Sequence, residues 1–327
     1  MNVLQLRREI EPELLRTPGI TGVSNIGNTI RIYVDGSPEL PTRINNFPVE
    51  VFKTGPINAL SLISQYQAPQ VLSGAPWIVP EVSVDPLRTG RYRPVPGGAS
   101  IGHPSITAGT HGVSLRFLGI PRGLSNNHVL AAGSTLQFPR ANIGDPAYQP
   151  GPYDGGTLSD AVGTLSWYKP IDTGGPNLVD AATWVPYSPD LMSDEILEIG
   201  DPKALGTVKV GDIVQKSGRT SGLLTAEVID VNATVNVNYG DFSADFHNQI
   251  ITDLIGEPGD SGSALLDMGG PNLVGLLFAG SKYVTIHNHI GNVLSAMGAT
   301  PPPDQEVSGS VTVSLLLSNA LLLLGLI

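Results

Sequence analysis

The stretch from Thr225 to Tyr239 alternates apolar and polar residues and limits what this chain can fold into more than any other. Alternation with period two is typical of antiparallel strands that have one face in a core and the other in water. The composition agrees, because 41% of the residues are hydrophobic while 39 glycines and 28 prolines interrupt the apolar runs. The sequence therefore predicts a globular, turn-rich, mainly β protein.

The 327 residues exceed one typical domain, so more than one domain is expected. Apolar residues at helical spacing within 3–16 are followed by strand-like runs, and we interpret residues 1–66 as a small α+β domain. Residues 67–99 are rich in proline and glycine and are interpreted as a linker. Two roles stay open for the N-terminal domain: a structural or docking module, or a regulatory cap over an active site.

Ser261 lies between glycines, directly after Asp260 and just before an apolar run that predicts a buried strand. A serine hydroxyl is a poor nucleophile unless a base and a site for the developing negative charge stand beside it. Gly259 allows the backbone to turn so that amide N–H groups converge on one point, as in an oxyanion hole. The alternative is an ordinary turn, because Gly, Ser and Asp dominate turns.

A histidine and an aspartate upstream complete a candidate catalytic set. His128 stands where an apolar strand passes into a segment of small residues. Asp180 interrupts an apolar run, where an unpaired carboxylate would be expensive to bury. The order His128, Asp180, Ser261 is the chymotrypsin order among serine triads. Other acids could take the place of Asp180, but Gly, Pro, Ser or Thr neighbours are typical of solvated turns: Asp145, Asp154, Asp160 and Asp172.

On these motifs, residues 100–298 resemble the trypsin-like (chymotrypsin-fold) serine peptidases of bacteria, in their disulfide-free form. The resemblance covers about 60% of the chain and implies two antiparallel β-barrels within residues 100–300, preceded by the α+β domain. The segment Val214–Gly222 is similar to a Ser-Gly-Arg-Thr-Thr-Gly stretch of the secreted bacterial enzymes. It implies that Arg219 pairs with Asp260 and supports the oxyanion loop.

The implied activity is that of a serine endopeptidase acting on a protein or peptide, without cofactor or metal. His128 would act as general base, Asp180 would orient it, and Ser261 would form the acyl-enzyme. The amides of Gly259 and Ser261 would form the oxyanion hole. The alternative is a catalytically silent peptidase fold that acts by binding or self-assembly.

The resemblance also assigns a specificity pocket. Ile255 would form its base, and Phe278, Ala279 and Gly280 its wall. Because Ile255 is uncharged, the pocket is expected to take an apolar residue rather than the Lys or Arg of trypsin-like cleavage. The nearby acid Glu257 could change that preference.

The composition limits the binding partners and the cellular compartment that are expected for this chain. The net charge of −11 argues against nucleic acid. The absence of cysteine excludes thiol catalysis and disulfides and fits a reducing compartment. Charged residues begin at Arg7, before the apolar core of a signal peptide could form, so a cytoplasmic location is expected.

Residues 301–327 form a proline-rich spacer and then an almost wholly apolar tail from Val311 to Ile327. Three uses stay open: packing against the rest of the protein, a marginal membrane anchor, or self-assembly into a homo-oligomer.

Overall fold

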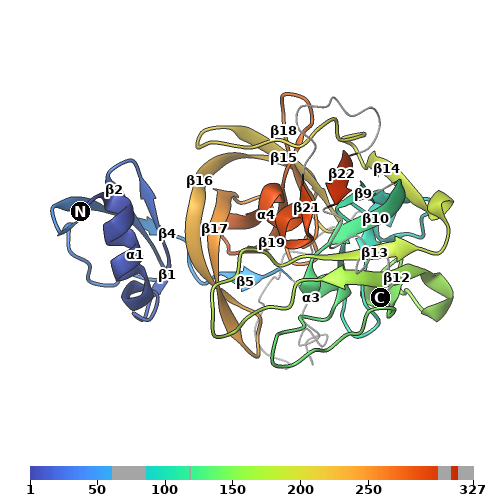
Figure 1. Cartoon of the computed structure of the whole chain (residues 1–327), viewed down its shortest axis with the longest axis horizontal. Coiled ribbons are helices and arrows are strands. Elements are labelled where there is room, and N and C mark those ends of the chain that lie inside the picture. The colour runs from blue at the N-terminus through green and yellow to red at the C-terminus, as the bar shows by residue number, and fades with distance from the viewer. Residues whose placement is uncertain (61–85, 118, 301–310, 316–327) are drawn as a thin grey trace, which may run out of the picture.

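The computed structural model describes residues 1–60, 86–117, 119–300 and 311–315. A small N-terminal domain lies beside a larger body built mostly of strands (Figure 1). The predicted fold class is confirmed in that the structure is mainly β, with a small helix-containing domain in front of a larger body of two β-rich halves.

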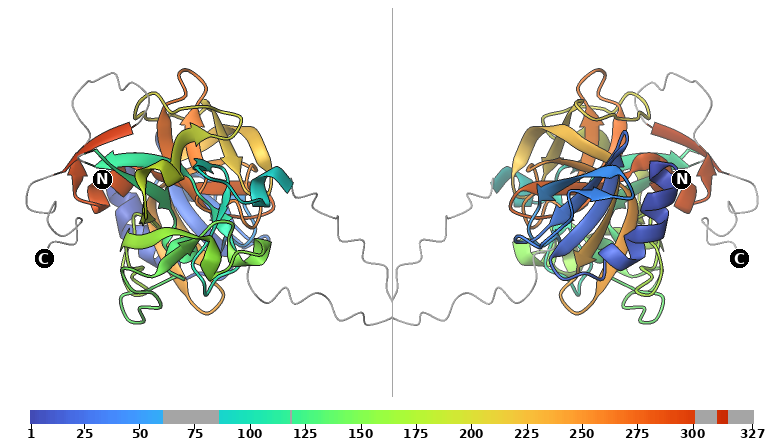
Figure 2. Two further views of the ribbon diagram at one scale, coloured as in Figure 1. Left: turned by 90° about the vertical axis from the view of Figure 1, so that its right-hand side faces the viewer. Right: turned by 90° about the vertical axis from the view of Figure 1, so that its left-hand side faces the viewer.

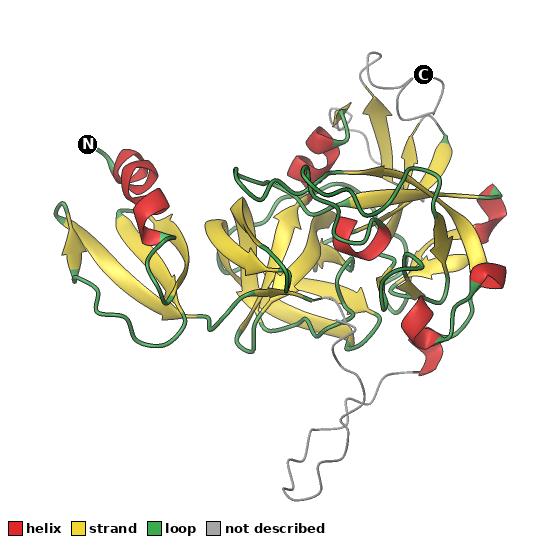
Figure 3. Cartoon of the chain, turned by 90° about the horizontal axis from the view of Figure 1, so that it is seen from below, coloured by secondary structure: helices red, strands yellow, loops and turns green. Residues whose placement is uncertain are grey.

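The N-terminal domain consists of one helix on a small sheet (Figure 3). The side chains of Asn2 and Gln5 cap the helix reciprocally, which satisfies backbone N–H groups at its first turn. Leu6 of the helix joins Val23 and Ile30 of the sheet in one buried cluster. The elements are α1 (Val3–Leu14), β1 (Ile20–Ile26), β2 (Thr29–Val34), β3 (Arg43–Ile44) and β4 (Phe47–Lys53).

The second half of the body is a closed antiparallel barrel. Its strands follow the order β15-β18-β19-β20-β17-β16, and pairing of β15 with β16 closes it. The alternating stretch found in the sequence, apart from its last residue Tyr239, lies within the longest strand, β16. The elements are β15 (Ile213–Gly218), β16 (Gly222–Asn238), β17 (Ser243–Asp253), β18 (Ala264–Asp267), β19 (Leu273–Gly280), β20 (Val284–His289) and α4 (Ile290–Ala296).

The first half is an antiparallel sheet in the order β11-β12-β13-β10-β9, and its ladder does not close on itself within the described residues. Two separate two-stranded sheets accompany it: β14 pairs with β6 in parallel, and β7 pairs with β8 antiparallel. The elements are α2 (Pro86–Thr89), β6 (Val95–Gly97), β7 (Ser100–Ile101), β8 (Gly109–Thr110), β9 (Val113–Phe117), β10 (Ile120–Ser125), α3 (Asn127–Leu130), β11 (Pro146–Tyr148), β12 (Ala161–Tyr168), β13 (Ala182–Pro186) and β14 (Met192–Ile196).

The sheet of the N-terminal domain continues into the second barrel. Strand β1 pairs with β16, with Val23 opposite Thr234. Arg7 donates to the Thr234 hydroxyl over 3.0 Å, and the Tyr33 hydroxyl donates to Asp230 over 2.5 Å. The domain is therefore joined to the barrel by a shared ladder and by buried polar contacts.

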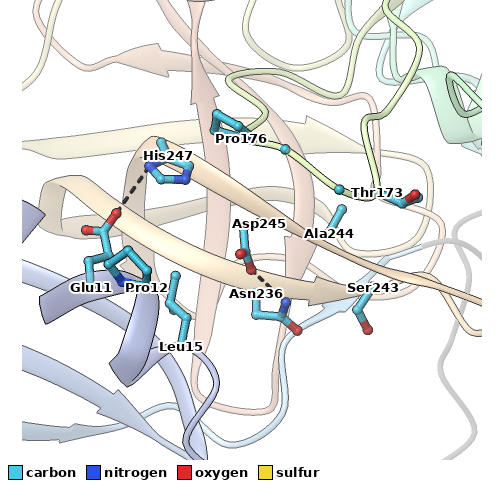
Figure 4. Close-up of a pocket in the computed structure, with 12 residues that line it drawn as sticks. Glu11, Pro12, Leu15, Thr173, Pro176, Asn236, Ser243, Ala244, Asp245 and His247 are labelled. Atoms are coloured by element: carbon cyan, nitrogen blue, oxygen red, sulfur yellow. Dashed lines mark hydrogen bonds and ion pairs between the residues drawn. The ribbon is translucent and has the colours of Figure 1, made fainter. Parts of the chain in front are cut away.

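A hollow of about 290 Å³ lies between α1 and the β16–β17 hairpin (Figure 4). At its rim Glu11 contacts His247 over 3.2 Å. Burial raises the pKa of Glu11, but the hydrogen bond from His247 and the charge of Arg7 outweigh it and hold that pKa below its usual value. A charged carboxylate thus links α1 to the barrel.

Part of the apolar tail adds a strand to the first half. Strand β22 (Val311–Leu315) runs parallel to β9, and β21 (Ala299–Thr300) pairs with β22 (Figure 2). Residues 316–327 lie outside the described residues, so the open uses of the tail stay predictions there. No helix among the described residues is both long enough and apolar enough to span a membrane.

Candidate active site

The loop that carries Ser261 precedes β18 in the second barrel. Gly259 and Gly262 have φ values of +100° and +96°, which side-chain-bearing residues rarely adopt. A Cβ on Gly262 would also lie 2.2 Å from the Ser125 hydroxyl oxygen. Ser261 is fully buried, and its hydroxyl donates to the carbonyl of Phe278 over 3.2 Å. The glycines thus fix a tight loop against the first half of the body.

His128 and Asp180 come from the first half and contact each other. His128 lies on α3, and its Nδ1 is 2.6 Å from Oδ2 of Asp180, which lies just before β13. The backbone N–H of His128 donates to the other carboxylate oxygen over 3.3 Å. Asp180 is fully buried, so these bonds offset the cost of burying its charge.

The rival acids have other contacts. Asp145 lies 3.2 Å from His103, and Asp172 accepts from the backbone of Gly174. Asp160 caps a short turn at Thr157, and Asp154 pairs with an arginine described below. Among the acids weighed from the sequence, the structure therefore brings Asp180 to His128.

His128 and Ser261 are not hydrogen-bonded to each other. The Nε2 atom of His128 is buried and has no hydrogen-bond partner within the described residues. The Ser261 hydroxyl is directed to Phe278 instead. The hydrogen bond that general-base catalysis by His128 would require is therefore not made in this structure.

The support of the oxyanion loop differs from the prediction. Asp260 accepts from Nζ of Lys216 over 2.9 Å and from the backbone amides of Thr220 and Glu257. Lys216 lies within β15 and is fully buried together with Asp260. Burial lowers the pKa of Lys216, and the charge of Asp260 counters that shift. The buried cation beside Asp260 is therefore Lys216.

The predicted pairing of Arg219 with Asp260 is wrong. Arg219 follows the end of β15, where strand alternation no longer fixes its side chain, and it reaches across to Asp154 with Nε at 2.9 Å from the carboxylate. Its guanidinium also lies 5.3 Å from the centre of the Tyr153 ring. Arg219 thus ties the short turn Pro152–Asp154 of the first half to the second barrel.

Of the predicted pocket residues, Ile255 packs in a different apolar cluster from Phe278 and Ala279. Ile255 is buried and its N–H donates to the Thr285 hydroxyl over 3.0 Å, while Phe278, Ala279 and Gly280 form the end of β19. Burial, together with the charge of Asp260, raises the pKa of Glu257.

Comparisons with curated proteins find bacterial serine proteases. The chain is 39% identical over 105 residues to streptogrisin-A of Streptomyces griseus, covering 31% of this chain and 34% of that protein. It is 42% identical over 81 residues to serine protease 2 of Streptomyces fradiae, covering 25% and 44%. The chain resembles the bacterial chymotrypsin-fold serine proteases. It spans between a third and a half of the length of these curated relatives.

Solved structures of bacterial serine proteases also match this chain. A glutamic acid-specific serine protease matches with a TM-score of 0.45 and 21% identity, over 62% of this chain and 98% of that one. Protease A of Thermobifida fusca matches with a TM-score of 0.46 and 19% identity, over 62% and 96%. No family model matches the sequence. The predicted resemblance to bacterial chymotrypsin-fold serine proteases is confirmed by the curated matches.

Sequence reasoning missed Tyr239 in this protease-like site. Its hydroxyl donates to Asp180 over 2.8 Å, and its ring centre lies 6.0 Å from that of His128. Burial, and then the charge of Asp180, raise the pKa of Tyr239 well above its usual value, so the hydroxyl keeps its proton. The alternation of the β16 segment predicts only that a strand ends near Tyr239 and gives no sign of this contact.

Replacing Tyr239 by phenylalanine should lower the free energy of unfolding by about 1.5–3 kcal/mol, because a buried carboxylate loses a donor. Urea denaturation measures this loss. The control is Tyr168→Phe, which removes a longer bond, 3.4 Å, to the neutral carbonyl of Ala141 and should cost less. Equal losses in the two variants would contradict a specific role for the Tyr239–Asp180 bond.

Proposed function

We propose that the chain is a serine endopeptidase in which His128, Asp180 and Ser261 form a catalytic triad. The observation that carries the proposal is the buried 2.6 Å contact between His128 and Asp180. The Ser261 loop of the second barrel is held to the same half of the body, because the N–H of Thr110 donates to the Ser261 carbonyl over 2.7 Å. The serine protease relatives support the same reaction class.

The reaction begins when the Ser261 hydroxyl turns from Phe278 to His128. His128 Nε2 takes the proton while Oγ attacks the carbonyl carbon of the substrate. The Gly259 and Ser261 amides stabilise the oxyanion, a contribution of about 10²–10³ in rate for each donor. His128 then protonates the leaving amine, and water hydrolyses the acyl-enzyme. Asp180 holds Nδ1 protonated throughout, with Tyr239 holding Asp180.

The pocket favours hydrolysis after an apolar residue. Ile255 supplies no negative charge for a Lys or Arg side chain, and the neighbouring strand end, Phe278–Gly280, is apolar. We therefore propose cleavage after uncharged, apolar residues rather than trypsin-like cleavage.

A catalytically silent scaffold is the second candidate, because His128 and Ser261 are not hydrogen-bonded to each other. Labelling with a fluorophosphonate, followed by mass spectrometry of the labelled peptide, distinguishes the two. An enzyme should be labelled at Ser261, and the label should be lost in His128→Ala and in Ser261→Ala. His103→Ala is the matched control, because this histidine also contacts an aspartate and should leave labelling unchanged. Absence of label in the wild-type chain and in a variant with an opened cleft, described next, would favour the scaffold.

A further inference from the structure

The last residues of the N-terminal domain lie in the body of the protein as an added strand. Strand β5 (Asn58–Ala59) pairs antiparallel with β19, with Ala59 opposite Ala279 and Asn58 opposite Gly280. In Figure 1, β5 lies among the barrel strands while the rest of the domain stays to one side. Its partner is the strand end predicted to form the wall of the specificity pocket. Peptides commonly bind to proteins by adding such a strand.

Both backbone groups of Leu60 are held by groups of the candidate site. The Leu60 N–H donates to the carbonyl of Phe278 over 3.1 Å, and the same carbonyl accepts from the Ser261 hydroxyl. The Leu60 carbonyl accepts from the N–H of Gly259 over 2.8 Å. That distance is the one expected between an oxyanion-hole donor and its oxygen. The Leu60 carbonyl oxygen therefore accepts from one of the two amides predicted to form the oxyanion hole.

The side chain of Leu60 lies between Gly280, a residue of the predicted pocket, and Gly256, which precedes the oxyanion loop. A Cβ built on Gly256 would be 2.9 Å from Leu60 Cδ1, and one on Gly280 would be 3.2 Å from it. Leu60 is only 6% exposed, and Ile57 and Ala59 are buried in a cluster with Phe278 and Ala279. The pocket thus accommodates a leucine side chain, and the glycines leave the room for it.

We propose that residues 57–60 are bound as a substrate and that the chain cleaves its own peptide bond after Leu60. The same contacts define the substrate class: an extended segment with a leucine-like residue before the scissile bond and a small residue before that. This inference rests on the proposed function. It assigns a processing site, and it identifies the N-terminal domain as the part of the chain that delivers the substrate.

The step balances with the groups already described. Ser261 Oγ bonds to the Leu60 carbonyl carbon, and its proton passes through His128 to the nitrogen of residue 61 as the C–N bond breaks. Water then hydrolyses the Leu60 ester, which leaves a carboxylate on Leu60 and restores Ser261. The products are residues 1–60 and a chain that begins at Ser61. Until residues 1–60 leave, residues 57–60 exclude other substrates from the cleft.

Purified full-length protein tests the processing site by intact mass and by sequencing of the new N-terminus. We expect a chain that begins at Ser61, formed with a first-order rate constant that does not change with protein concentration. Ser261→Ala should stay whole. Leu60→Asp should stop cleavage at this bond, because the apolar pocket rejects a carboxylate. Leu4→Asp, on an exposed position of α1, is the matched control and should be processed like the wild type.

Hydrolysis of a separate peptide distinguishes the proposed endopeptidase activity from the proposed self-cleavage after Leu60. The peptide acetyl-Ile-Asn-Ala-Leu-aminocoumarin should be hydrolysed at least about tenfold faster than the same peptide ending in Asp or Arg. In the Leu60→Asp variant, the fluorophosphonate should also label Ser261 several-fold faster than in the uncut wild type, because residues 57–60 of the variant no longer fill the cleft. An active, labelled chain that stays whole, with no gain in labelling for Leu60→Asp, would overturn the inference and leave the endopeptidase intact. Absence of label in every variant would overturn both.

Discussion

Replacing Asp180 by asparagine should slow the reaction of Ser261 with a fluorophosphonate by about 10⁴-fold, with little change in fold. The His128 ring bonds to Asp180 through Nδ1, so the carboxylate keeps the proton on that nitrogen and leaves Nε2 free to accept. An asparagine can turn its N–H₂ group to Nδ1, which moves the ring proton to Nε2. Ser261 then has no base.

The comparison is with Asp145→Asn, which alters another histidine–aspartate contact in the first half, 3.2 Å to His103. That variant should be labelled at nearly the wild-type rate. Labelling rate constants on folded protein, checked by thermal melting, measure both effects. If the labelling rate constant of Asp180→Asn fell by less than about tenfold, or by no more than that of Asp145→Asn, Asp180 would not be the residue that orients His128.

The sequence identified the candidate triad because each member has a local signature. Ser261 has glycines around it, His128 follows a strand, and Asp180 is an acid within an apolar run. An acid in such a run needs a partner, and this reasoning chose Asp180 over four acids in turn-like surroundings. The alternation within β16 likewise identified the longest strand without any knowledge of its partners.

Contacts between distant residues could not be predicted in this way. Tyr239 and Asp180 are far apart in the sequence and meet only because β16 ends beside α3. Leu60 follows a two-residue strand, which is too short to leave a periodic signal, and its place depends on pairing with β19. The choice between Lys216 and Arg219 depends on where β15 ends, and strand ends are the least certain part of a sequence-based assignment.

The structure pairs Asp260 with Lys216 where the sequence predicted Arg219, and this ion pair gives the second prediction with a large expected effect. Replacing Lys216 by methionine should lower the free energy of unfolding by about 3–5 kcal/mol, because Asp260 would stay buried without its cation. The oxyanion loop depends on Asp260, whose carboxylate also accepts from the backbone amides of Thr220, Ser221 and Glu257. Labelling of Ser261 should therefore fall even under conditions where the variant remains folded.

The matched control is Arg219→Met, since Arg219 is the cation that the resemblance had assigned to Asp260. Its partner Asp154 lies on a loop of the first half, so this variant should keep the oxyanion loop ordered and retain more labelling than Lys216→Met. The double variant Lys216→Met, Asp260→Asn should recover part of the lost stability, because the carboxylate is then neutral. Urea denaturation and labelling rates measure both properties. A larger loss of labelling in Arg219→Met, or no recovery in the double variant, would mean that Lys216 does not hold the loop through Asp260.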